Sequence, residues 1–94
     1  MRILNLPLLE KFKQHHADAK GQLDAWRDGV GRESWQTPQD IKQRYKSTDF
    51  LSDNRVIFNI KGNSYRLVVQ VRYRGEIVLI EWVGTHAEYS KKKF

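Results

Sequence analysis

The chain has 94 residues, the size of one folding unit, and its 39% hydrophobic and 30% charged residues are an ordinary globular balance. It contains no cysteine, which excludes disulfides, thiolate metal sites and cysteine nucleophiles. The longest uninterrupted apolar run, Ile77–Ile80, is far shorter than the roughly 20 residues of a membrane-spanning helix, and no signal peptide is visible. We therefore expect a single soluble, cytoplasmic domain over residues 1–94.

The charge is the informative part of the composition. Lysine and arginine number 17 against 11 aspartates and glutamates, which gives a net charge of +6. Such a basic domain is compatible with a polyanionic partner such as RNA or DNA, because binding phosphates releases counterions. Many small basic proteins have no nucleic-acid role, so the charge alone does not decide between a binding function and solubility.

Apolar residues in the first third of the chain recur at spacings of three and four, which indicates helices packed on one side. A break at His15–Asp18, with Asp18 as a cap, favours one helix over about 8–15 and a second over about 18–30. The stripe consists of Leu9, Phe12, His16 (marginal), Ala19, Leu23, Trp26 and Val30.

A third helix has a clear start signal. Thr37 can serve as the N-cap, Pro38 as the first helical residue and Asp40 as the third, near the positive end of the helix dipole. We expect this helix to end near Lys46 and to be followed by a polar connection over residues 47–54.

The adjacent histidines His15 and His16 point in different directions on a helix. No acidic residue stands at a usual metal-ligand spacing with another histidine. We interpret both as solvated side chains and expect neither a metal site nor a cofactor.

The second half of the chain is typical of antiparallel strands. Arg55–Ile60, Tyr65–Tyr73 and Glu76–Val83 are rich in valine, isoleucine and aromatic residues, and turn residues at Gly62-Asn63 and Arg74-Gly75 separate them. Two-residue turns there pair Ile60 with Tyr65, Phe58 with Leu67, Val56 with Val69, Asn59 with Arg66, Val69 with Ile80 and Leu67 with Trp82.

Side chains alternate along a strand, so the polar residues of these strands share the opposite face. A solvated polar face is the ordinary interpretation. Its basic residues have apolar neighbours and no acidic excess, which favours a binding face. The face holds Arg55, Asn59, Arg66, Val68, Gln70, Arg72, Leu79 and Glu81.

Several separated blocks resemble the HigB-type toxins of the RelE-like toxin–antitoxin superfamily. They are Asn54–Ile60, Gly62–Val69 and Gly84–Tyr89, with weaker similarity in Trp35–Tyr45 and Asp49–Leu51. Order and spacing are kept over about residues 20–89. The resemblance implies an α+β, RelE-like fold, with N-terminal helices packed on one face of a small, mainly antiparallel sheet.

The resemblance also implies a function and partners. Such toxins are endoribonucleases that cleave mRNA, typically on the translating ribosome. A HigA-type antitoxin with a helix-turn-helix would silence the toxin, and operator DNA would be reached only through that antitoxin. No membrane is involved.

Carried over by position, the resemblance implies a catalytic set of His86, Arg66 and Tyr89. Substrate-binding positions would be Asn59 and, more weakly, Lys61, and the terminal Lys91 and Lys92 add charge suited to phosphates.

RNA cleavage by the 2′-hydroxyl needs a base, an acid and a cation on the developing charge, but no metal. Histidine, with an ordinary pKa of about 6.5, suits either proton transfer, and which of His86 and Tyr89 is base or acid stays open. Arginine suits the phosphate as a bidentate clamp. The alternative is a non-catalytic RNA-binding or protein-interaction domain. A DNA-binding role ranks third, because no basic recognition helix is apparent.

Overall fold

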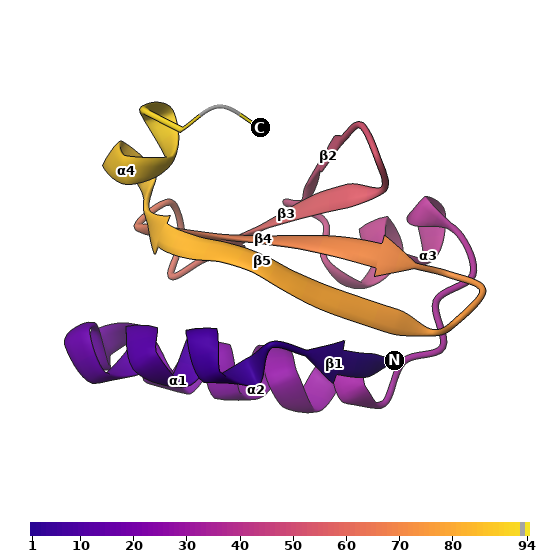
Figure 1. Ribbon diagram of the computed structural model, residues 1–94, viewed down its shortest axis with the longest axis horizontal. Coiled ribbons are helices and arrows are strands. Elements are labelled where there is room, and N and C mark those ends of the chain that lie inside the picture. Colours follow the sequence, from indigo (N-terminus) through magenta and orange to yellow (C-terminus); the bar gives the residue numbers. More distant parts are fainter. Residues whose placement is uncertain (93) are drawn as a thin grey trace.

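The computed structural model describes residues 1–92 and Phe94. It has a five-stranded sheet with the two long N-terminal helices against one face (Figure 1), which confirms the expected α+β class. The strand order is β1-β5-β4-β3-β2, in which β1 pairs parallel with β5 and the other pairs are antiparallel. In chain order the elements are β1 (Arg2–Leu4), α1 (Leu6–His15), a 3₁₀ helix (Ala17–Ala19), α2 (Lys20–Gly31), α3 (Pro38–Arg44), β2 (Asp49–Leu51), β3 (Arg55–Ile60), β4 (Tyr65–Arg72), β5 (Ile77–Thr85) and α4 (His86–Ser90).

The core lies between the helices and the sheet face toward them. The predicted stripe is buried there, since Leu9, Leu23, Trp26 and Val30 are each at most 3% exposed. Trp26 meets Phe58 of β3 edge to face, with ring centroids 5.5 Å apart. Large aromatic side chains therefore fill much of this small core.

The break between the first two helices lies where the sequence predicts it, but two expectations there are wrong, the cap at Asp18 and the solvated His16. Asp18 lies inside the 3₁₀ helix, and Ala19 is the N-cap residue of α2. His16 ends α1, and its ring stacks on Phe12 at 4.2 Å and meets the edge of Tyr65 at 5.2 Å. It therefore packs against the apolar stripe instead of being solvated. His15 is exposed, as expected.

The register of β3 on β4 is confirmed in every predicted pair, including Asn59 with Arg66. The predicted pairing of β4 with β5 is correct at Val69–Ile80 and wrong beyond it. The register shifts between Val68 and Val69, so that Leu67 faces Val83 and Trp82 faces Val68. An extra residue in one strand turns the following side chains to the other face.

Two short strands were missed. The segment expected as a connection contains β2, and β1 precedes α1 as a parallel neighbour of β5. Asn5, in the left-handed conformation (φ 70°), donates from Nδ2 to the Ile80 carbonyl at 2.9 Å and turns the chain into α1. Three-residue strands are too short to show an alternating pattern.

The third helix has the predicted capping box of Thr37 and Asp40. It ends at Arg44, slightly before the expected Lys46. The Tyr45 ring turns into the core beside Phe58, with 5.2 Å between the ring centroids.

Within the described residues, no helix is long and apolar enough to cross a membrane.

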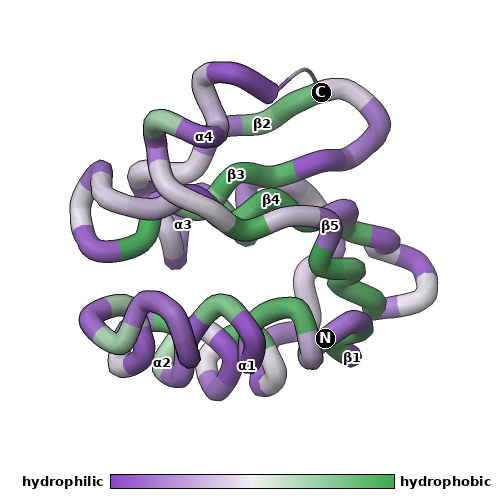
Figure 2. Tube along the Cα trace, turned by 60° about the vertical axis from the view of Figure 1, so that its left-hand side comes forward, coloured by the Kyte–Doolittle hydropathy of each residue, from purple (hydrophilic) through white to green (hydrophobic). Residues whose placement is uncertain are grey.

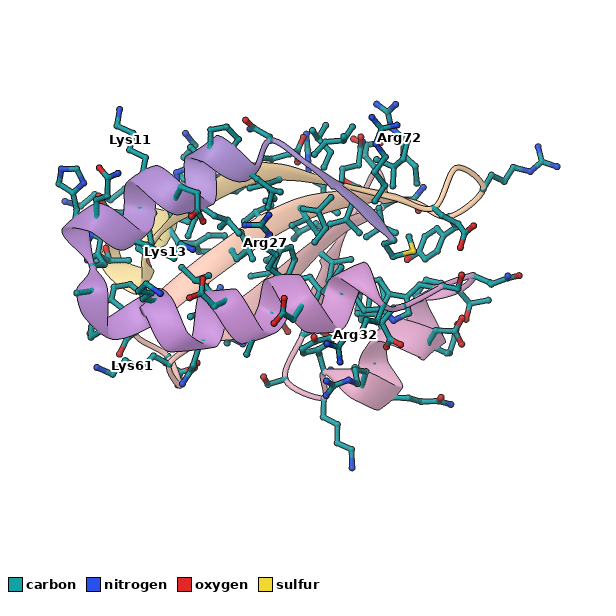
Figure 3. All side chains as sticks on the ribbon, turned by 90° about the horizontal axis from the view of Figure 1, so that it is seen from below. Lys11, Lys13, Arg27, Arg32, Lys61 and Arg72 are labelled. Carbon is teal, nitrogen blue, oxygen red and sulfur yellow. The ribbon has the colours of Figure 1, made fainter. Side chains whose placement is uncertain are left out.

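Asp24 of α2 joins the two long helices. Its carboxylate lies 2.6 Å from Lys13 Nζ of α1 and 2.8 Å from Lys20 Nζ, and Figure 3 shows Lys13 between α1 and α2. Hydrogen bonds from Lys13 and Lys20 lower the pKa of Asp24 to about 2. An aspartate in the unfolded chain titrates at about 3.9. The folded pKa is depressed, so this contribution to stability is complete above the unfolded value and is lost as pH falls toward 2.

We predict that Asp24→Asn lowers the free energy of unfolding at neutral pH and flattens its fall between about pH 4 and 2. Urea unfolding measured at a series of pH values checks this. Asp28→Asn, an exposed aspartate of the same helix, serves as the control. An unchanged pH dependence in Asp24→Asn would contradict the assigned role.

Candidate active site

The sheet face away from α1 and α2 carries the predicted polar residues. We call it the outer face, defined by Arg55, Ile57, Asn59, Arg66, Val68, Gln70, Glu81 and Trp82. Figure 2 shows α4 and the C-terminal end on this side of the sheet, opposite α1 and α2. Ile57 and Val68 are buried, at 1% and 0% exposure, although they are not part of the main core. The outer face is therefore partly covered.

Helix α4 is held over the end of the sheet by its first residues. Thr85 and Glu88 form a reciprocal capping box, with the Thr85 N–H donating to Glu88 Oε1 at 2.8 Å and the Glu88 N–H to Thr85 Oγ1 at 3.1 Å. The hydrogen bond from the Thr85 backbone N–H lowers the pKa of Glu88. The His86 N–H donates to the Ser64 carbonyl in the β3–β4 turn at 3.1 Å. The predicted strand ends at Val83, but β5 continues through Gly84 to Thr85 and α4 follows directly.

Arg66 is the central cation of the site. Its guanidinium carbon lies 4.6 Å from the Tyr89 ring centroid, and it sits directly across from Asn59. Its Nε is buried without a hydrogen-bond partner, and no carboxylate pairs with it among the residues described. Arg55 on the same face differs, because its Nε donates to Glu81 at 2.7 Å. Arg66 thus keeps its charge and hydrogen bonds for an anionic ligand.

The Tyr89 ring beside this cation is part of a group of three aromatic side chains. Trp82, Tyr89 and Phe94 form a cluster with centroids 5.7–6.0 Å apart. We call it the aromatic cluster. Phe94 is 41% exposed, so part of the cluster faces solvent. Exposed aromatic rings beside an arginine are suited to stacking the bases of single-stranded RNA.

Sequence reasoning missed Trp82, because the predicted register placed it on the apolar inner face. The glycine at position 84, two residues later, is the sequence feature that could have indicated the position of Trp82. A Cβ at Gly84 would lie 2.5 Å from Trp82 Cζ2, so the indole ring occupies the space a side chain would fill. An aromatic residue two positions from a strand glycine is compatible with such a close approach.

The structure brings some predicted site residues together and leaves others apart. Asn59 and Arg66 are neighbours across the strands, and Tyr89 covers Arg66. His86 is exposed at the start of α4 and precedes Tyr89 by three residues, so both lie on one side of the helix. Lys91 and Lys92 are exposed directly after α4.

Lys61 lies elsewhere. Its Nζ pairs with Asp18 Oδ2 at 2.8 Å, and Figure 3 shows it on the helical side of the molecule. Hydrogen bonds from Lys61 and from the Tyr65 hydroxyl lower the pKa of Asp18. These contacts tie the β3–β4 hairpin to the helical layer, which is a structural use of this lysine.

Replacing Gly84 by alanine should displace the Trp82 ring, because the added Cβ cannot fit beneath it. We expect a loss of about 1–3 kcal/mol in the free energy of unfolding, typical of overpacking, and an altered tryptophan emission spectrum. Gly21→Ala, where an added Cβ meets nothing within 4 Å, is the control and should stabilise helix α2 slightly. Unchanged emission and stability in Gly84→Ala would contradict the close approach.

Within residues 1–92 and Phe94, no three histidine, aspartate or glutamate side chains gather closely enough to hold a metal ion. The arrangement itself consists of side chains from β3, β4, β5 and α4. It offers the half-buried Arg66, the side chains of His86 and Tyr89, and the rings of the aromatic cluster as stacking surfaces.

Comparison with known proteins places the chain in a family. Residues 19–92 match the family model of the HigB toxins, described as the RelE-like toxic component of a toxin–antitoxin system. The chain is 30% identical over 82 residues to the "mRNA interferase toxin HigB" of Escherichia coli (strain K12), an alignment that covers 85% of this chain and 75% of the relative. The "mRNA interferase HigB" of Shigella flexneri matches with the same identity and coverage. On this evidence the chain belongs to the HigB family of RelE-like toxins of toxin–antitoxin systems.

Proposed function

We propose that this protein is the toxin of a type II toxin–antitoxin pair and acts as an endoribonuclease on mRNA. Its relatives carry the name mRNA interferase. The observation that carries the proposal is Arg66, a half-buried arginine without a carboxylate partner among the described residues, set against the ring of Tyr89.

The proposed reaction needs no metal. The 2′-hydroxyl of one nucleotide loses its proton to a base and attacks the adjacent phosphorus. The bond from phosphorus to the 5′-oxygen breaks, and an acid protonates that oxygen. The products are a 2′,3′-cyclic phosphate and a free 5′-hydroxyl. The barrier falls when cations stabilise the negative charge that develops on the phosphate oxygens.

The residues of the candidate active site have different roles in the proposed reaction. Arg66 clamps the scissile phosphate, because its planar guanidinium presents parallel donors to two oxygens. His86 and Tyr89 carry the two proton transfers. Asn59 orients the phosphate or a base edge. The remaining contacts hold the strand by charge and by stacking, through Lys91, Lys92, Trp82 and Phe94. Lys61, which pairs with Asp18, contributes at most to the broad positive field.

We further propose a setting for this activity. The mRNA would be cleaved in the cytoplasm during translation, with the ribosome holding the codon against the outer face. A HigA-type antitoxin with a helix-turn-helix would bind the toxin and silence it, and operator DNA would be bound through that antitoxin. A domain of this size has a small surface for binding RNA, so the ribosome would supply part of the positioning of the mRNA.

Mapping of mRNA 5′ ends in a translation reaction tests the function. We expect new, discrete ends with wild-type protein and far fewer with His86→Ala after the same reaction time. A 5′-hydroxyl at each new end, and resistance of an mRNA with a 2′-deoxynucleotide at the cleaved position, would identify the 2′-hydroxyl as the attacking group. A 5′-phosphate would contradict the metal-independent route. Stoichiometric, salt-sensitive RNA binding without cleavage would favour the non-catalytic alternative.

A further inference from the structure

A pocket lies at the open edge of β3, one strand away from Arg66. β2 pairs only with Arg55, Val56 and Ile57, so in the described residues the second half of β3 has no strand beside it on that edge. The chain between α3 and β2 passes there, and α2 lies on the helical side. Together they enclose about 280 Å³, with a lining that includes Trp26, Arg44, Tyr45, Ser47, Phe58 and Asn59.

Two residues of the pocket lining, Trp26 and Asn59, each carry a buried polar atom that has no hydrogen-bond partner among the residues the structure describes. Trp26 is 3% exposed, and its Nε1 donor is buried and unpaired. Asn59 donates from Nδ2 to the Ser47 carbonyl at 2.6 Å, while its Oδ1 acceptor is buried and unpaired. Trp35, the other tryptophan packed on Phe58, differs because its Nε1 donates to Glu33. Buried polar groups in folded proteins are nearly always paired, so an unpaired donor and an unpaired acceptor on two residues of one pocket lining favour a ligand that pairs with both.

A nucleobase has this chemistry. Its edge carries both acceptors and donors, and its flat faces can stack on an aromatic ring such as that of Tyr45, which is partly exposed. Arg44 is exposed beside the pocket, with its guanidinium 5.1 Å from the Tyr45 ring centroid, where it can meet the nucleotide's phosphate. Pockets for drug-sized ligands begin at about 300 Å³, so the volume suits one base and excludes a longer stacked segment.

The position of the pocket links it to the candidate active site. Asn59 belongs to the pocket lining and is also the direct cross-strand neighbour of Arg66. We propose that the pocket is a base-binding subsite that receives one unpaired base of the RNA strand whose scissile phosphate lies on Arg66. Trp26 and Asn59 read the edge of that base. This inference rests on the proposed function and assigns it a determinant of sequence preference.

Nuclear magnetic resonance of the indole N–H groups tests the subsite without any cleavage. The chain has three tryptophans, and Trp26→Phe identifies the Trp26 signal by its loss. We expect at least one of the four nucleoside 5′-monophosphates to shift the Trp26 signal and to leave the Trp35 signal in place. Ribose 5-phosphate, which has the sugar and phosphate but no base, should leave both unchanged. A Trp26 signal that stays fixed with every monophosphate, or moves equally with ribose 5-phosphate, would overturn the subsite.

Two matched variants give the energetic test. Trp26→Phe removes the donor and keeps an aromatic ring against Phe58, and Trp35→Phe makes the same change outside the pocket. We expect Trp26→Phe to weaken binding of the preferred monophosphate about fivefold, the usual effect of one hydrogen bond, and Trp35→Phe to change it by less than about twofold. Equal affinities in both variants would contradict the reading of the base by Trp26.

Cleavage maps then separate this inference from the proposed function. If the subsite is correct, wild-type protein and Trp26→Phe both cleave translated mRNA, and the variant shows a broader choice of base beside the cleaved bond. Cleavage with an unchanged map would overturn the subsite and leave the nuclease in place. Absence of cleavage by wild-type protein would overturn the nuclease, and with it the subsite.

Discussion

Replacing Arg66 by alanine is expected to lower the rate of mRNA cleavage by about 10²–10³-fold, the usual effect of removing a group that stabilises transition-state charge. The guanidinium has no carboxylate partner in the described residues and lies over Tyr89, so its loss removes the cation at the phosphate position. Single-turnover cleavage of mRNA on programmed ribosomes measures the effect, and growth arrest in cells should disappear with it.

Three comparisons make this result specific to Arg66. Arg72→Ala removes an exposed arginine from the end of the same strand and should leave cleavage within about threefold of wild type. Arg66→Lys keeps the charge but loses the bidentate fork, so we expect an intermediate rate. Thermal unfolding and antitoxin binding should be preserved in Arg66→Ala. Full activity in a folded Arg66→Ala protein would exclude Arg66 from the site.

Replacing His86 by alanine should lower the cleavage rate by about 10²–10⁴-fold, the range for loss of a general acid or base. The anchoring hydrogen bond of α4 is made by the His86 backbone N–H to Ser64, and alanine retains it. The fold should therefore survive, and the loss should report the imidazole itself.

The pH dependence distinguishes proton transfer from simple contact. A plot of the wild-type cleavage rate against pH should rise or fall through the ionisation of His86, and this change should be missing from His86→Ala. His15→Ala, an exposed histidine on α1, should keep the full profile. A His86→Ala protein with a slower rate but the same profile would assign the proton transfer to another group, of which Tyr89 is the first candidate.

Local signals were enough to predict much of the fold. The turn at Gly62-Asn63 sets the β3–β4 register, because a two-residue loop leaves one way to align the strands, and the alignment of Asn59 with Arg66 followed from it. The capping box at Thr37 was equally local. β1 pairs with β5 across more than seventy residues of chain, and no local pattern reports such a contact.

The candidate site also has a part that local sequence signals predicted and a part that depends on contacts between distant segments. Asn59 and Arg66 were placed together by strand register alone. The contact of Arg66 with Tyr89 depends on α4 folding back over the sheet, which the Thr85 cap and the Ser64 carbonyl direct. Trp82 was misplaced because a bulge shifts the β4–β5 register between Val68 and Val69. Lys61 was assigned to the substrate, but Asp18, distant in sequence, holds it on the helical side.

The sequence by itself determined that this is a small, basic domain without cysteine, with helices before antiparallel hairpins and a family resemblance across most of its length. It did so because helix periodicity, strand alternation and turn chemistry are local properties. Only the tertiary structure decided which charges remain without an acidic partner. Arg55 and Lys61 are neutralised by Glu81 and Asp18, whereas Arg66 has no such partner in the described residues. Charge pairing between distant segments follows from packing in space, and for that reason the +6 of the composition could suggest a polyanion but not the arginine that would hold it.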